Sequence, residues 1–284
     1  MTITRRTWLV RTGITGTAAL MASRARAADA PKLLGGKLFF MVRRTYAQGI
    51  DIAALRTPAE PAHRQHLLKF GQTVVASALI DDTGARIGSV SISDINTRKD
   101  IERYVYDDPF TKAGIYGSIA ITPVDLYKVD GSYNRAPAWF APELRERQLA
   151  EGYDVPVLPT GDAGAKTMFL LSRHYIPKPD FSRLKAEHDA AHKDYVSALS
   201  PTVFSAAGFD AHWNRVSDMA VADFSDRAAM QRYVDDDPFT KAGMFTRVDI
   251  ERVDLYKLDG RYNRAPGWFA DDMKRRQDSR AGKT

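Results

Sequence analysis

The chain has 284 residues, and 41 lysines and arginines against 35 acidic residues give it a formal net charge of +6 at pH 7. It contains no cysteine, which excludes disulfides, iron–sulfur clusters, thiolate zinc sites and cysteine nucleophiles. Residues 1–27 hold five arginines and no acid, so removing them would lower the charge to about +1, and net charge gives no reason to expect nucleic-acid binding.

The amino terminus resembles a twin-arginine export signal. Residues 4–10 read TRRTWLV, a weakly apolar stretch follows over 13–22, and Ala25-Arg26-Ala27 is a small-residue cleavage pattern. An ordinary amphipathic helix is the alternative. We predict cleavage after Ala27 and a periplasmic location. No apolar run approaches the roughly 18–20 residues needed to span a bilayer, so we expect no membrane span in the mature chain.

A long internal repeat organises the rest of the chain. Residues 103–141 recur at 232–270 with a constant offset of 129, which pairs Asp108 with Asp237. This period is too long for a solenoid or a propeller blade, which repeat every ~20–50 residues. We therefore predict a duplicated domain. Its parts are a first unit at 36–141, a linker at 142–165, a second unit at 166–270 and a basic tail at 271–284, each unit ending in an aromatic strap (133–140 and 262–269).

The first unit shows alternating strand and helix patterns. Residues 60–70 place His63, His66, Leu67 and Phe70 on one helical face. Thr97 is expected to cap the second helix, with Asp100 at the capping-box position. The expected strands are 37–43, 73–80, 87–94, 115–122 and 124–129.

This order is β-α-β-β-α-β, the ferredoxin-like arrangement of an antiparallel sheet with both helices on one face. The second unit repeats it over 168–172, 185–199, 202–209, 215–222, 226–234 and 244–252. Because each sheet leaves one face bare, two units can cover each other. We predict an α+β fold in which the two units form a dimeric α+β barrel within one polypeptide, with a shared interior that holds the active site. Further oligomers remain possible.

The run Asp108-Pro109-Phe110 has a local explanation. Proline disfavours helical geometry at the preceding residue, so the helix must break at Asp108, which can cap a new turn that Gly114 closes. This predicts a structural role for Asp108 and its counterpart Asp237.

Residues 74–94 (VVASALIDDTGARIGSVSISD) followed by 107–116 (DDPFTKAGIY) resemble the YCII-related (YciI-like) family. The resemblance implies ferredoxin-like domains that pair as α+β barrels. One family member is associated with dehydrochlorination of a chlorinated hydroquinone. The family has a proline shortly before its active-site aspartate, and neither unit here has it, which leaves the pocket wall undefined.

The same resemblance implies an acid–base pair between a helix histidine and the aspartate after the second strand. The matching pairs are His63 with Asp81 and His192 with Asp210. An imidazole held by a carboxylate is a competent general base near neutral pH. The anion that it forms would need a cation nearby, and the candidates for substrate binding are Arg43, Arg44 and Arg173. His66 and His188 are competing helix histidines.

We therefore expect an enzyme that needs no cofactor or metal and that performs elimination or isomerisation on a small, possibly aromatic or enolisable molecule. One alternative is a periplasmic binding or protein-interaction module without turnover. Another is haem binding, because tandem ferredoxin-like barrels include haem proteins, with a histidine such as His192 as the axial ligand.

Overall fold

The computed structural model describes residues 38–70, 73–95, 97–129, 132–133, 168–177, 180–199, 202–224, 226–258 and 261–262. The predicted signal peptide, linker and basic tail lie outside these ranges, as do all but the first residue of each aromatic strap. Within the described ranges, no helix combines the length and the apolar character that crossing a membrane requires.

Both repeats have the predicted order of elements, with one short helix added after the second long one. The first consists of β1 (Leu38–Tyr46), α1 (Ile52–Phe70), β2 (Thr73–Ile80), β3 (Arg86–Ser93), α2 (Arg98–Tyr106), α3 (Pro109–Lys112), β4 (Tyr116–Val129) and β5 (Ser132–Tyr133). The second consists of β6 (Met168–Tyr175), α5 (Asp180–Leu199), β7 (Thr202–Phe209), β8 (Arg215–Asp223), α6 (Arg227–Asp236), α7 (Pro238–Lys241), β9 (Phe245–Leu258) and β10 (Arg261–Tyr262).

Helix α1 begins eight residues earlier than the sequence pattern predicted. Asp51 precedes it and accepts a hydrogen bond from the backbone N–H of Ala54 at 3.0 Å, which satisfies one of the free donors of the first turn. Pro58 and Pro61 lie inside the helix. Each proline removes one backbone donor from the hydrogen bonds of the helix.

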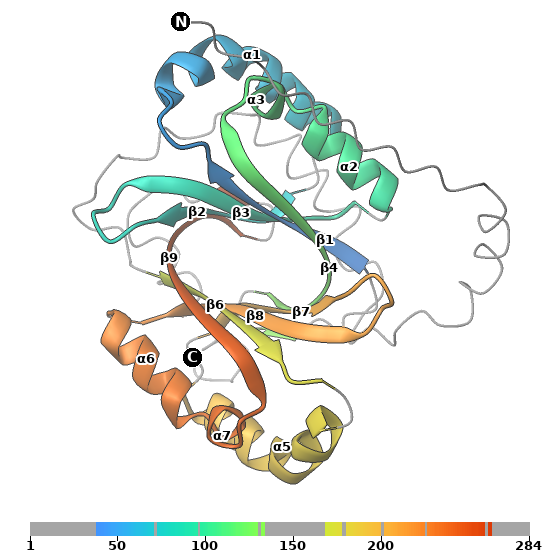
Figure 1. Ribbon diagram of the computed structural model, residues 1–284, viewed down its shortest axis with the longest axis vertical. Coiled ribbons are helices and arrows are strands. Elements are labelled where there is room, and N and C mark those ends of the chain that lie inside the picture. Colours follow the sequence, from blue (N-terminus) through green and yellow to red (C-terminus); the bar gives the residue numbers. More distant parts are fainter. Residues whose placement is uncertain are drawn as a thin grey trace, which may run out of the picture. The chain divides into compact units, whose positions relative to one another are not determined.

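Eight strands close into a barrel that both repeats share. Their hydrogen-bonded order is β1-β3-β2-β9-β6-β8-β7-β4, and β4 pairs again with β1. The two repeats meet at two antiparallel seams, β2 with β9 and β4 with β7. The helices lie on the outside of the strands (Figure 1). The predicted fold class, two ferredoxin-like units forming one α+β barrel, is confirmed.

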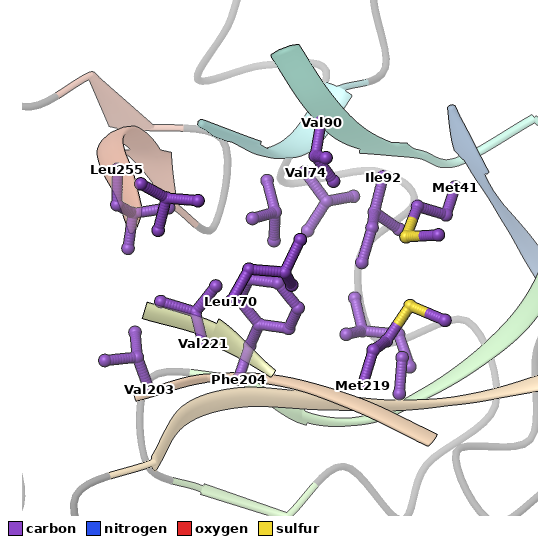
Figure 2. Close-up of a cluster of buried hydrophobic side chains, with 14 of the residues drawn as sticks. Met41, Val74, Val90, Ile92, Leu170, Val203, Phe204, Met219, Val221 and Leu255 are labelled. Carbon is purple, nitrogen blue, oxygen red and sulfur yellow. The ribbon is translucent and has the colours of Figure 1, made fainter. Parts of the chain in front are cut away.

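The interior of this barrel is an apolar core. Side chains from both repeats meet there, among them Met41, Ile92, Leu170, Phe204 and Met219, as Figure 2 shows. Every member of this cluster is a buried hydrophobic residue. The expectation of an active site in the shared interior is therefore wrong, because this packed core occupies the inside of the barrel.

Alternation along the strands sends the remaining buried side chains outward, toward the helices. Phe40 and Val42 of β1 pack with α2, and Phe169 and Leu171 of β6 pack with α6. By the same period of two, Arg173 lies on the helix-facing side of β6. A polar side chain such as Arg173 therefore lies in the layer between the sheet and the helices.

Candidate functional site

The same three-residue contact occurs in both repeats. Nδ1 of His63 on α1 lies 2.7 Å from Oδ1 of Asp108, and the imidazole stacks on Phe110 with ring centres 3.7 Å apart. In the second repeat, Nδ1 of His192 on α5 lies 2.7 Å from Oδ1 of Asp237, and the ring stacks on a phenylalanine at 3.8 Å. Each contact joins the first long helix to the start of the short helix.

The aspartates have the predicted capping role and a second role besides. Asp108 and Asp237 are the N-cap residues of α3 and α7, and each carboxylate accepts the N–H of the phenylalanine two residues on at 2.9 Å. Both are buried. The same Oδ1 that caps the helix also contacts the histidine, so capping fixes the carboxylate exactly where the imidazole needs an acceptor.

Both carboxylates are held ionised. Burial alone would raise the pKa of Asp237, but the hydrogen bond with His192 and the charge of Arg173 outweigh it and lower that pKa below its usual value. For Asp108, the hydrogen bond with His63 likewise outweighs burial and lowers the pKa. An ionised carboxylate only accepts hydrogen bonds, so Nδ1 of the imidazole carries the proton, and Nε2 of a neutral ring is free to accept one.

The aspartates that the family resemblance implied lie elsewhere. Asp81 is in the turn between β2 and β3, where its Oδ1 accepts from the backbone of Thr83 and Ala85 at 2.9 Å and from the Thr83 hydroxyl at 2.7 Å. Asp210 makes the same kind of turn, accepting from the backbone of His212 and Asn214 at 2.8 Å. The expected pairing of these two aspartates with the histidines is wrong, since each carboxylate is occupied by its own turn.

Two of the three arginine candidates have structural partners. Arg43 forms an ion pair with Glu251 of β9, which links the two repeats. Arg44 is buried, donates to the Ser91 hydroxyl at 3.2 Å, and its guanidinium lies over the ring of Tyr104. Neither contact identifies a ligand site, and their predicted role in substrate binding stays a prediction.

The third candidate, Arg173, is the centre of a buried ionic network. Its Nε and Nη2 donate to the two oxygens of Asp218 at 2.7 and 3.1 Å, and its Nη1 donates to Oδ2 of Asp237 at 2.5 Å. Asp237 therefore bridges Arg173 and His192. Burial alone would lower the pKa of Arg173, but the two carboxylates outweigh it and raise that pKa, so the guanidinium stays charged.

Two further side chains extend the network away from the histidine. The Tyr175 hydroxyl donates to Oδ2 of Asp218 at 2.7 Å, and Nη2 of Arg215 donates to that hydroxyl at 3.0 Å. A continuous series of hydrogen bonds thus runs from Arg215 to His192. In such a network each side chain is held in position by its hydrogen-bond partners, and loss of one side chain leaves a buried polar group without its partner.

A cavity opens beside this network, between the sheet and the helices of the second repeat. Its volume is about 110 Å³. An engineered cavity of roughly 150 Å³ binds benzene, so the space here is no larger than one small ring. Lining residues come from β4, β6, α5, β7, β8 and α6: Tyr127, Leu171, Arg173, His192, Lys193, Val196, Thr202, Ser205, Asp218, Met219, Ala220, Ala222 and Tyr233.

The lining combines one base with several neutral donors. Burial raises the pKa of both Tyr127 and Tyr233 to about 12, so their hydroxyls stay protonated at neutral pH. His192 faces the cavity with its Nδ1 already engaged by Asp237. The arrangement can take a proton at Nε2, stabilise the resulting imidazolium through Asp237, and hold an oxygen of a bound molecule near Arg173.

A haem fits this space poorly. Ligand pockets for molecules smaller than a porphyrin are already ~300–1,000 Å³, several times the cavity beside His192. Among the described residues, no group of three or more histidine, cysteine, aspartate or glutamate side chains is placed to hold a metal ion.

Comparison with known proteins gives distant structural likenesses. No family model and no curated protein sequence matches this chain. A mutant chlorite dismutase from Candidatus Nitrospira defluvii has 10% identity and a TM-score of 0.47 over 78% of this chain and 92% of its own. A putative monooxygenase from Lactobacillus acidophilus NCFM has 10% identity and a TM-score of 0.43 over 80% and 97%.

A third structure covers one repeat only. The 5-chloro-2-hydroxyhydroquinone dehydrochlorinase of Burkholderia phenoliruptrix AC1100 has 22% identity and a TM-score of 0.25 over 29% of this chain and 89% of its own. None of these likenesses assigns an activity here. The chain is a tandem ferredoxin-like protein whose two repeats close one α+β barrel, and that description rests on its own strand pairing.

Sequence reasoning missed Asp237 and Asp218 as site residues. A signal for Asp237 was present, because the capping aspartate and the helix histidine both recur at the 129 offset. Asp218 had no such signal, since the equivalent position in the first repeat is Ser89. Only the register of β6 against β8, which places Asp218 directly beside Arg173, identifies it.

Proposed function

We propose that this protein is an enzyme that moves a proton on a small molecule, and that the second repeat performs the reaction in the cavity beside His192. The observation that carries this proposal is the combination of a cavity-lining imidazole, a buried carboxylate on its Nδ1 and a charged guanidinium on the same carboxylate. It is the arrangement expected of a general base whose carboxylate partner is fixed in place.

The roles follow from the contacts. Nε2 of His192 accepts a proton from an acidic C–H or O–H of the ligand, and Asp237 stabilises the imidazolium. The protonated hydroxyls of Tyr127 and Tyr233 line the same cavity and can donate to the oxygen that carries the anion left on the ligand. Returning the proton to another carbon completes an isomerisation, and loss of a leaving group with its electron pair completes an elimination. The resemblance to YciI-like proteins supports a single-ring or enolisable substrate, and none of these steps requires a cofactor.

Hydrogen–deuterium exchange of a ligand tests the proposal without knowledge of the natural substrate. The full chain is incubated in D2O with single-ring ketones whose α-protons exchange slowly in buffer, such as cyclohexanone and its hydroxylated relatives. NMR then measures deuterium at the α-carbon. We expect exchange above the buffer rate for ligands that bind.

Binding without exchange across such a panel would favour the non-catalytic binding module instead. A Soret absorption band in the purified protein would point to haem and would contradict the assigned cavity. These outcomes separate the three functions that the sequence left open.

We also infer that the protein is exported by the twin-arginine route and acts in the periplasm, from the TRRTWLV run and the Ala25-Arg26-Ala27 pattern. Replacing Arg5 and Arg6 with lysine should leave uncleaved precursor in the cytoplasm, as measured by cell fractionation and mass spectrometry of the amino terminus. Unchanged export of that variant would contradict the inference.

A further inference from the structure

The two repeats share the histidine–aspartate contact but differ in charge at one position beside it. Arg173 of β6 lies opposite Asp218 of β8 in the antiparallel register. Arg44 of β1 lies opposite Ser89 of β3 in the equivalent register. The two pairs are related by the 129 offset, so the arginine is kept and its opposite residue changes from an acid to a neutral serine.

Asp218 determines how Arg173 is held. Paired residues on adjacent strands project to the same face, and here the carboxylate meets the planar fork of the guanidinium at both Nε and Nη2. This two-point contact leaves Nη1 directed at Asp237. Tyr175 donates to Asp218 in turn, so the carboxylate cannot rotate without losing that bond as well.

The charges differ accordingly. In the second repeat one guanidinium is flanked by two carboxylates, Asp218 and Asp237. Asp218 therefore balances Arg173, and the negative charge of Asp237 remains available to His192. In the first repeat the capping carboxylate of Asp108 feels the charge of Arg44, and the position of Asp218 carries the uncharged Ser89.

We propose that Asp218 is a positioning residue for proton transfer in the second repeat: by holding Arg173 at two points and offsetting its charge, it lets Asp237 support proton transfer at His192. The equivalent position of the first repeat carries Ser89, and there the His63–Asp108 contact joins α1 to α3. This inference rests on the proposed function, and it assigns to that site a residue that acts through Arg173 and Asp237.

Covalent modification of histidine by diethylpyrocarbonate tests the inference without a substrate. The reagent is attacked by an unprotonated imidazole nitrogen, so its rate reports how nucleophilic that nitrogen is. The full chain is treated at about pH 8, above the usual histidine pKa of about 6.5. Peptide mass spectrometry then gives the rates of His63 and His192 in the same molecule, so each histidine serves as the other's control.

Asp218→Ser should slow His192 roughly three- to tenfold relative to His63, because without that carboxylate the charge of Arg173, about two hydrogen bonds away, disfavours positive charge on the ring. Asp218→Asn keeps the shape of the side chain but not its charge, and it should also lower the modification rate of His192. Neither Asp218 variant should change the rate of His63 by more than about twofold.

A His192 rate that is unchanged or increased in both Asp218 variants, with circular dichroism showing a folded chain, would overturn the inference. A purely structural Asp218 would lower the melting temperature and leave the ratio of the two rates unaltered. The proposed function fails by a different result, namely ligand binding without deuterium exchange, so the two failures can be told apart.

Discussion

Replacing His192 with asparagine should lower the rate of deuterium exchange into a bound ketone by roughly 10²–10⁴-fold, the usual contribution of a positioned general base. The carboxamide can still meet Asp237 through its N–H, but it offers no basic nitrogen to the cavity. The measurement is the α-carbon exchange rate by NMR at saturating ligand, compared with the unmodified chain.

His63→Asn is the matched control in the first repeat. Both substitutions remove an imidazole stacked on a phenylalanine at similar distance, 3.7 Å in one repeat and 3.8 Å in the other, and both remove a 2.7 Å contact to a capping aspartate. Their structural costs should therefore be alike. Equal loss of exchange in the two variants would show that the effect is structural, and it would contradict a base at His192.

Much of the fold could be predicted from the sequence because its determinants are local or repeated. The caps at Thr97 and Asp108 and the turn closed by Gly114 all appear where the sequence placed them. Because the sequence repeats at an offset of 129 residues, most of these signals occur twice in the chain. The start of α1 was missed because the prediction followed only the apolar and histidine spacing of residues 60–70, and the helix begins at Ile52.

The site was harder to predict, because its members are joined by strand register and not by sequence spacing. The family resemblance paired His63 and His192 with the turn aspartates Asp81 and Asp210, whereas in the structure both histidines contact the capping aspartates. The sequence predicted only a capping role for Asp237, and the contact between its second carboxylate oxygen and Arg173 was therefore missed. The prediction that the active site lies inside the barrel failed for a related reason. Side chains alternate along β6, so Leu170 is buried inside the barrel and Arg173 lies on the outer side, facing the helices.

Asp237→Ala should lower the free energy of unfolding by about 3–5 kcal/mol, the range seen when one partner of a buried ion pair is removed. Arg173 and His192 both lose their shared acceptor in a place that water reaches poorly, and α7 loses its cap. Arg173 keeps its two-point contact with Asp218, so the loss falls on the histidine side of the network. Urea unfolding followed by circular dichroism measures this change.

Asp108→Ala provides the comparison, because it removes the same cap and the same histidine contact from the first repeat. A lost cap costs about 1 kcal/mol and a lost hydrogen bond about as much again. We therefore expect Asp108→Ala to cost roughly 2 kcal/mol, clearly less than Asp237→Ala. Asp108 also feels the charge of Arg44, so the difference between the variants compares the hydrogen bond from Arg173 with that interaction. Equal losses would contradict a larger contribution from the Arg173 bond.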